Sequence, residues 1–154
     1  MPNLYQTYSG GSGETARSGF TPEGERNMTT AQDTTLEIGN KLVALCNEGK
    51  NLEAIETLYS PAIESVEACS GPDMDRVMKG IDAIKGKNQW WIDNHEVHSS
   101  KAAGPYLNED RFTVIFDIDV TFKPKSQRCQ MREVALYTVK DGRIVKEEFF
   151  YTLQ

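Results

Sequence analysis

The feature that most constrains the fold is the run FTVIFDIDVTF at residues 112–122, in which apolar and polar side chains alternate. Successive side chains of a β-strand point to opposite faces, so this period of two separates an inward set from an outward set. The apolar set is Phe112, Val114, Phe116, Ile118, Val120 and Phe122, and the polar set is Thr113, Asp117, Asp119 and Thr121. The run therefore predicts a long antiparallel strand with one buried face.

Further strands are predicted on both sides of this run. The turn-forming stretch KPKSQ leads into RCQMREVALYTV, and Asp141-Gly142 is typical of a two-residue hairpin turn before RIVKEEFFYTL. The short stretch AIESVEA predicts one earlier strand, and the turn formers SGPDMDR follow it as a loop. The second half of the chain thus predicts a meander of long strands.

The first half of the chain predicts helices. Thr34 and Glu37 have the spacing of a capping box ahead of an apolar stripe, so a first helix is expected from Thr34 to Gly49. Asn51 is expected to cap a short second helix, which Pro61 stops. These two helices should pack as a hairpin.

A third helix is expected at about residues 81–95, where apolar residues recur at helical spacing. Helices followed by a meander indicate an α+β fold, with three N-terminal helices packed on a curved, mostly antiparallel sheet. We assign this domain to residues 34–154. Residues 1–33 are rich in Gly, Ser, Thr and charge and lack an apolar period, so a mobile leader is expected there.

The composition argues against several classes of function. With 23 acidic against 17 basic residues and no basic run, nucleic acid is not an expected partner. A membrane is not expected either, because the chain lacks a stretch of roughly eighteen apolar residues and a signal-peptide pattern, and we expect a cytoplasmic protein. The phosphate-binding glycine motifs and the G-x-S-x-G nucleophile motif are also absent from the sequence, and we expect no cofactor.

Three stretches of the sequence match a known family in their order along the chain and in their residue patterns. They are LVALCNEGKNLEAIETLYSPAIESVEA, GIDAIKGKNQWW and REVALYTVKDGRIVKEEFFY. From about Leu36 to Tyr151 the chain resembles the SnoaL-like branch of the nuclear transport factor 2-like superfamily, whose cone-shaped α+β barrels include ketosteroid isomerase. The resemblance implies a pocket between the concave face of the sheet and the three helices. This fold hosts isomerases, cyclases, dehydratases, transport factors and dimerisation domains, so it does not itself name an activity.

The resemblance also implies positions for catalytic groups. Ketosteroid isomerase uses a carboxylate base together with an oxyanion hole made of a tyrosine and a protonated aspartic acid. In this chain the base position falls on Glu67 and the protonated-acid position falls near Glu133. The tyrosine position falls on Leu42, which has no hydroxyl, so one group of that constellation is absent.

Glu133 is also a candidate from its own pattern. Alternation places it on one face with Ala135 and Tyr137, while Arg132 takes the other face, so Glu133 and Tyr137 are expected to line the pocket. Burial would raise the pKa of the Glu133 carboxyl and let it donate a hydrogen bond to a developing oxyanion. The alternative is that Glu133 pairs with a nearby arginine or accepts local hydrogen bonds.

For Glu67 the strand parity does not decide, because Glu64 occupies the opposite face of the same stretch. The resemblance favours Glu67 as a base that removes a proton from carbon next to a carbonyl group. The alternative is a solvated carboxylate at the edge of a strand.

The stretch NQWWIDNHEVH contains both tryptophans and both histidines of the chain. Asn88, Trp91 and His95 share one side of the predicted helix and are expected to line the pocket, whereas Trp90 and His98 are expected to lie outside it. His95 is a candidate catalytic base, or it only caps the helix, whose dipole favours the protonated ring. We expect no metal, because His95-x-x-His98 lacks a third ligand and the cysteines lack C-x-x-C spacing.

Two functions follow from these candidates. The first is a cofactor-free enzyme of the isomerase, cyclase or dehydratase type, acting by general acid/base chemistry on a small apolar carbonyl compound. Glu67 or His95 would be the base, and Glu133 the acid or oxyanion stabiliser. The alternative is a non-catalytic small-molecule-binding or dimerisation module of the same fold, which the absent tyrosine favours. Carboxyls that face one cavity would support the enzyme, and carboxyls that face solvent or lysines would support the module.

The outward face of the predicted sheet carries Ile115, Val134 and Leu136. Apolar residues on a face that should be solvated suggest a partner surface, and a two-fold homodimer is the commonest way to cover one. The resemblance implies the same assembly. The alternative is a monomer in which the leader folds over this face.

Overall fold

The computed structural model describes residues 23–70 and 75–152. The elements in chain order are α1 (Glu23–Asn47), α2 (Asn51–Leu58), β1 (Tyr59–Val66), β2 (Val77–Lys79), α3 (Ile81–Asn94), β3 (His95–Asn108), β4 (Arg111–Phe122), the 3₁₀ turn η1 (Lys123–Lys125), β5 (Gln127–Lys140) and β6 (Arg143–Phe150). The strands form one six-stranded sheet in the order β2-β1-β6-β5-β4-β3. Its neighbours are antiparallel except for β1 and β6, which are parallel.

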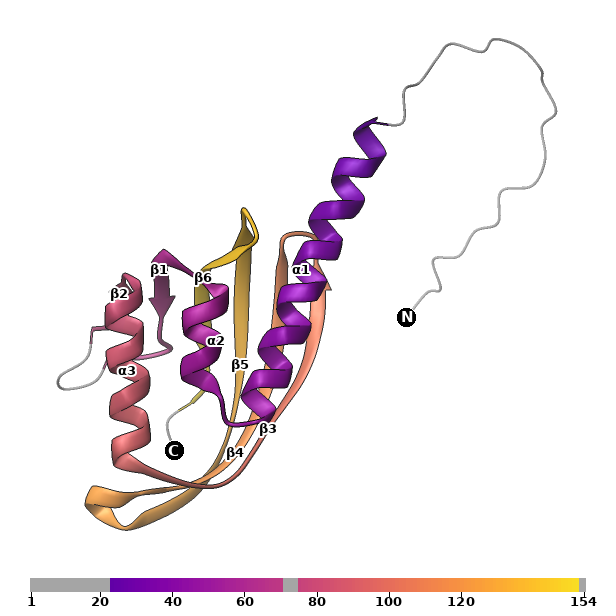
Figure 1. Cartoon of the computed structure of the whole chain (residues 1–154). Coiled ribbons are helices and arrows are strands. Elements are labelled where there is room, and N and C mark those ends of the chain that lie inside the picture. Colours follow the sequence, from indigo (N-terminus) through magenta and orange to yellow (C-terminus); the bar gives the residue numbers. More distant parts are fainter. Residues whose placement is uncertain (1–22, 71–74, 153–154) are drawn as a thin grey trace, which may run out of the picture.

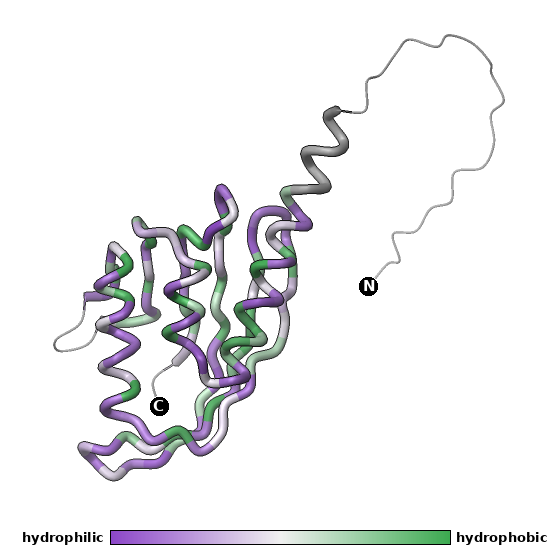
Figure 2. Tube along the Cα trace, viewed as in Figure 1, coloured by the Kyte–Doolittle hydropathy of each residue, from purple (hydrophilic) through white to green (hydrophobic). Residues whose placement is uncertain are grey.

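The long strands curve around the helices, which lie on one face of the sheet (Figure 1). Hydrophobic residues recur along the helices and central strands and are interrupted by hydrophilic ones, as amphipathic elements require (Figure 2). The predicted α+β class and the helices on a curved, mostly antiparallel sheet are confirmed. No helix in the described part of the chain is long and apolar enough to cross a membrane.

The core lies between the helices and the concave face of the sheet. Phe112 and Val114 of β4 are fully buried, which confirms the inward face predicted from the period of two. The Phe112 ring stacks on Tyr137 of β5 with ring centroids 5.0 Å apart. The predicted two-residue turn is also confirmed, since Asp141 and Gly142 have φ angles of 50° and 72°, the left-handed conformation that such hairpins need.

Two predicted helix starts are wrong. The first helix is already formed at Glu23, so Thr34 is not its N-cap, and the Thr35 hydroxyl instead donates to the Ala31 carbonyl within the helix. Residues 23–33 contain no proline to prevent this extension. Asn51 is the first residue of α2 rather than its cap, because the Lys50 carbonyl accepts the first helical hydrogen bond. The remainder of the predicted leader, residues 1–22, lies outside the described residues.

Two strand boundaries also differ from the sequence pattern. The short strand β2 follows a stretch predicted as a loop, and it pairs with the end of β1. Strand β3 begins at His95, directly after α3, whereas the predicted third helix ran to about residue 95.

The packing of α1 on β3 generates a stability prediction. A Cβ atom added at Gly39 would lie 2.7 Å from the Cβ atom and 2.9 Å from the Cγ atom of Pro105. We expect Gly39→Ala to destabilise the protein by about 1–3 kcal/mol, because overpacking would push the helix from the sheet. Urea unfolding measures the change.

The control is Gly86→Ala in α3, where an added Cβ meets no atom within 4 Å. Alanine there should stabilise the protein by roughly 0.5–1 kcal/mol through helix propensity alone. Equal effects of the two substitutions would contradict the close approach of α1 and β3.

Candidate functional site

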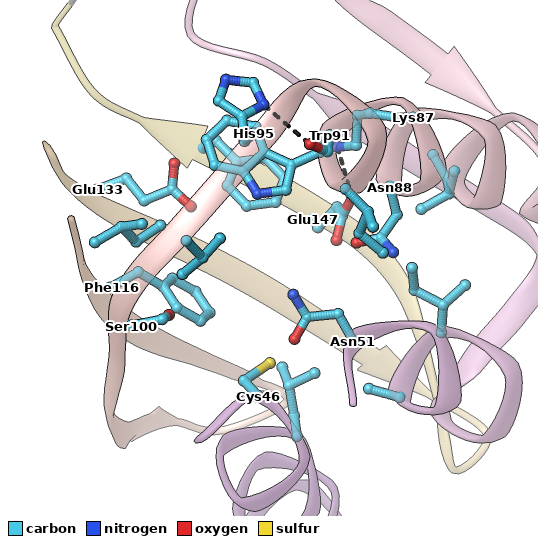
Figure 3. A pocket seen from close by; sticks show the side chains of 18 of the residues that line it. Cys46, Asn51, Lys87, Asn88, Trp91, His95, Ser100, Phe116, Glu133 and Glu147 are labelled. Atoms are coloured by element: carbon cyan, nitrogen blue, oxygen red, sulfur yellow. Dashed lines mark hydrogen bonds and ion pairs between the residues drawn. The ribbon is translucent and has the colours of Figure 1, made fainter. Parts of the chain in front are cut away.

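A cavity of about 560 Å³ opens between the three helices and the sheet. Figure 3 shows side chains of α1, α2, α3 and the strands converging on it. Its polar lining residues are Cys46, Asn51, Tyr59, Glu67, Lys87, Asn88, His95, Ser100, Glu133, Tyr137, Glu147 and Tyr151. The rest of the lining is mainly apolar, as in a site for a mostly apolar compound.

The structure brings the six predicted site residues to this one cavity. They are Glu67, Glu133, His95, Asn88, Trp91 and Tyr137. Trp90 lines the cavity too, against expectation, and is 52% exposed at its edge. Its ring lies beside those of His95 and Phe122, with ring centroids 5.7 Å and 6.5 Å away, while about half of the side chain faces solvent.

His98 lies away from the cavity, on the exposed side of β3. Its Nε2 atom is 2.7 Å from the Thr121 hydroxyl. Within residues 23–70 and 75–152, no three His, Cys, Asp or Glu side chains are grouped so that they could hold a metal ion.

A buried ion network forms part of the cavity wall. The Lys87 ammonium donates to Glu67 Oε1 at 2.7 Å and to Glu147 Oε1 at 3.2 Å. The two glutamate side chains are only 9% and 3% exposed. Glu67 is therefore a buried, paired carboxylate, and the alternative of a solvated strand edge does not hold.

Hydroxyl groups complete the network. Tyr59 donates to Glu147 Oε2 at 2.6 Å, and Ser65 donates to Glu147 Oε1 at 2.7 Å. Tyr151 donates to Glu67 Oε2 at 3.0 Å. Both oxygens of both glutamates are thus occupied by protein donors, as buried charges require.

The charges of the network act on its members. Burial lowers the pKa of Lys87, but the nearby charges of Glu147 and Glu67 and the hydrogen bonds to them outweigh burial, so the pKa lies above its ordinary value. Burial, with the Glu147 charge, raises the pKa of Tyr59 far above its ordinary value. Lys87 therefore stays cationic and Tyr59 stays a neutral donor at physiological pH.

Glu133 has a different environment. It lines the cavity from β5, and its carboxyl points toward the cavity in Figure 3. Its oxygens have no hydrogen-bond or ion-pair partner among the described residues. Burial first, and then the Glu67 charge, raise the pKa of Glu133 to about 7, although Lys87 acts against them.

His95 follows the last residue of α3. Its Nδ1 atom lies 3.0 Å from the Trp91 carbonyl, and its ring stacks on the Trp91 ring with centroids 3.7 Å apart. A carbonyl only accepts, so Nδ1 carries the hydrogen and Nε2 keeps a lone pair when the ring is neutral. Burial lowers the pKa of His95 and outweighs the hydrogen bond to the Trp91 carbonyl, which acts in the opposite direction, and Lys123 adds a smaller lowering. From the sequence, the helix dipole was expected to favour the protonated ring.

Sequence reasoning missed Lys87, Glu147 and the hydroxyls around them. Lys87 follows Ile84 by three positions and precedes Trp91 by four, so it lies on the pocket stripe of α3 and could have been found there. Ser65 shares a strand face with Glu67, which also gave a signal. Glu147 gave none, because a bulge in β6 changes the alternation before it.

Comparison with known proteins assigns the family. A model of the SnoaL-like domain matches residues 33–151. The chain belongs to the SnoaL-like family. No curated protein matches it. Its SnoaL-like fold is the one expected from the sequence.

Solved structures agree with this assignment. A candidate SnoaL-like polyketide cyclase from Mesorhizobium loti, also named as a carbohydrate phosphatase, is 43% identical, covers 75% of this chain and 97% of its own, and superposes with a TM-score of 0.71. A candidate SnoaL-like polyketide cyclase from Jannaschia sp. CCS1 is 14% identical over 78% of this chain and 86% of its own, with a TM-score of 0.63. A candidate isomerase from Bacillus subtilis is 16% identical over 78% and 87%, with a TM-score of 0.64. The last two share the fold alone.

The ion network generates the second prediction. We expect Lys87→Met to destabilise the protein by about 3–5 kcal/mol at neutral pH, because it leaves two buried carboxylates without their cation. Urea unfolding at pH 7 measures this loss.

Lys85→Met is the matched control. Lys85 lies two positions before Lys87 on α3, on another face of the helix. The Lys85 ammonium lies 3.0 Å from Glu56, but the two side chains are 36% and 58% exposed. Its loss should cost less than about 1 kcal/mol. A Lys87 variant as stable as the Lys85 variant would show that the network carries no net stabilisation.

Proposed function

We propose that this SnoaL-like protein is a cofactor-free enzyme that moves a proton on a small, mostly apolar carbonyl compound, in an isomerase, cyclase or dehydratase type of reaction. The observation that carries the proposal is the free carboxyl of Glu133. Of the three carboxyls that line the cavity, Glu67 and Glu147 are occupied by protein donors, and Glu133 alone has no partner among the described residues.

Glu133 and His95 have complementary proton affinities. The pKa of Glu133 is raised to about 7, so near neutral pH a large fraction carries a proton and can donate it. The pKa of His95 is lowered, so its ring is mostly neutral and can accept a proton at Nε2. Two groups whose environments push their pKa values in opposite directions are suited to the roles of acid and base.

The proposed reaction uses these two groups in turn. His95 removes a proton from carbon next to the carbonyl group, while Glu133 donates a hydrogen bond or a proton to the oxygen that gains negative charge. Trp91 and Tyr137 contact the apolar body of the substrate. Glu67, a candidate base from the sequence, instead positions Lys87 and the end of the cavity, because its oxygens are already occupied.

The name of the Mesorhizobium loti relative also supports a carbonyl substrate, since polyketides are carbonyl compounds. A phosphate ester, the other substrate in that name, fits this cavity less well. Lys87 is the sole Lys or Arg among the described lining residues, and two carboxylates already hold it. Phosphoryl transfer needs free cationic or N–H donors around the phosphate oxygens.

The alternative of a binding module rests on the pairing of Glu67 with Lys87. That pairing removes one candidate base, but it leaves Glu133 open to the cavity. The enzyme is therefore the stronger proposal. The cytoplasmic location expected from the sequence stays a prediction.

Glu133→Gln tests the proposal. Purified protein is incubated in D₂O with a panel of enones, β-dicarbonyl and hydroxy-carbonyl compounds, and NMR follows exchange or rearrangement at the carbon next to the carbonyl. We expect the wild type to accelerate at least one reaction, and Glu133→Gln to lower kcat by about 10²–10⁴-fold with a small change in KM. Activity should fall below the pKa of His95 and above about pH 7, where Glu133 loses its proton.

Glu64→Gln is the control, because Glu64 lies on the outer face of β1 and pairs with Lys79 at 3.3 Å. It should leave the rate unchanged. No turnover of any compound above buffer would sink the proposal.

The same variant gives an independent check in stability. A folded-state pKa of about 7 against 4.5 for a free glutamate means that the folded state holds the proton more tightly. The stability from this group is fully present below pH 4.5 and is lost as the pH rises through 7. Glu133→Gln should therefore raise the stability above pH 8 by up to about 3 kcal/mol and change it little at pH 5. Thermal unfolding at the two pH values measures this, and a loss at both would contradict it.

We also propose a homodimer through the outer face of the sheet. Ile115 pairs in register with Val134, and Val134 pairs with Phe150, which is 55% exposed. With Leu136 they form an apolar patch on this face. Light scattering at micromolar concentration should give about twice the 17.3 kDa chain mass, and Val134→Lys with Leu136→Lys should reduce it to one chain. A wild-type mass of one chain would refute the dimer.

A further inference from the structure

Two side-chain amides face the cavity without protein partners, Asn51 at the start of α2 and Asn88 on α3. Figure 3 shows both amides directed into the cavity, on the side away from Glu133. Asn88 Nδ2 is buried and is the one buried side-chain nitrogen or oxygen without a hydrogen bond in the described part of the chain. A buried donor in this state is unfavourable unless another molecule satisfies it.

The position of Asn88 argues against an accidental loss of the hydrogen-bond partner of its Nδ2 atom. The residue before it, Lys87, satisfies three acceptors, so the helix can direct polar groups to partners here. Asn88 instead interrupts the apolar stripe of α3 between Ile84 and Trp91 and has no protein acceptor for its nitrogen. Because this nitrogen is shielded as it stands, the amide must turn about its last side-chain bond before Nδ2 can donate to a ligand in the cavity. Asn51 is exposed, so its amide is open to a ligand without rotation.

The charges around the cavity restrict what the amides can bind. Glu67 and Glu147 place two negative charges in the cavity wall against one lysine, which they already hold, and Glu133 adds a third when it is ionised. An anionic group would be repelled by these carboxylates and would find no free cation. A neutral oxygen that accepts a hydrogen bond is not repelled by the carboxylates and needs no free cation.

We infer that Asn51 and Asn88 form a clamp for a neutral oxygen, a ketone or hydroxyl, at the end of the ligand distant from Glu133. The inference rests on the proposed function in taking this cavity as the substrate site, and it defines the substrate class more closely. The substrate is an uncharged compound with an apolar body, a reacting carbon near Glu133 and a second polar oxygen held by α2 and α3. A carboxylate at that end is excluded.

The test measures binding, not turnover. Trp90 and Trp91 are the only tryptophans of the chain, and both line the cavity, so quenching of intrinsic fluorescence reports occupation directly. Three ligands with one ring skeleton serve as probes: tetralin, 2-tetralone and 1,2,3,4-tetrahydro-2-naphthoate. The wild type should bind 2-tetralone about tenfold more tightly than tetralin, and the carboxylate most weakly, since pairing a buried donor is worth about a factor of ten.

The variant Asn51→Leu/Asn88→Leu should bind 2-tetralone and tetralin within about twofold of each other. Retained tetralin binding shows that its cavity is intact, and if it does not fold, the exposed single variant Asn51→Leu should by itself reduce the ketone preference. Asn40→Leu, which removes an exposed amide of α1 that does not line the cavity, should keep the full preference. A wild type without ketone preference, or a preference that survives removal of both amides, would overturn the clamp.

Glu133→Gln separates this inference from the proposed function. If that substitution, rather than the loss of the amides, abolishes the ketone preference, the oxygen is bound by Glu133 and the clamp is wrong. If the amides set the preference but no carbonyl compound is turned over, the clamp stands and the acid/base enzyme fails.

Discussion

The ion pairs of the Lys87 ammonium group are the interaction on which this part of the cavity wall depends. They join α3 to the end of β1 through Glu67 and to β6 through Glu147. Removing these three charges from water is costly, and the cost is offset only because the hydroxyls of Ser65, Tyr59 and Tyr151 occupy the remaining oxygens. The network thereby fixes how far α3 stands from the sheet, and the cavity lies in the space that this separation leaves.

The same network gives the three carboxyls of one cavity different roles. Two glutamates use their oxygens to bind Lys87 and the hydroxyls. Burial is the main cause that raises the pKa of Glu133, and the charges of the two glutamates add to it, although Lys87 acts against them. A structural ion cluster therefore adjusts the proton affinity of a neighbouring group that it does not touch, which is how a glutamate comes to hold a proton near neutral pH.

Much of the fold could be predicted from the sequence, because many of its elements have a local signal, such as side-chain alternation or turn-forming residues. The alternation in residues 112–122 gave the buried face of β4, and Asp141-Gly142 gave the last hairpin turn. The start of α1 could not be predicted from its caps, since Thr34 has a capping pattern inside a longer helix. The strand β2 was also missed, because it is short and pairs only with the end of β1.

The site was only partly predictable, for a reason that one strand makes clear. Glu133 could be placed because β5 alternates regularly through it. In β6, Thr138 pairs with Lys146 and Val139 with Ile144, so the strand advances by two residues against one and contains a bulge. Ile144 and Glu147 both point inward across that bulge, although simple alternation puts them on opposite faces. A bulge is set by the pairing of two strands and cannot be read from one of them.

The place of β6 in the sheet has a consequence for how the chain matures on the ribosome. β6 comes last along the chain among the six strands of this sheet, yet it lies between β1 and β5 and is parallel to β1. Until residues 143–150 emerge, β1 and β2 have no partner strand in the β3–β4–β5 meander, and the two parts of the sheet are joined only through the helices, since α1 packs on β3. Over the same interval Lys87 lacks Glu147, one of the two carboxylates with which it forms ion pairs. The sheet therefore becomes continuous only when β6 pairs with both β1 and β5, and the same late step brings Glu147 and Phe149 into the cavity wall.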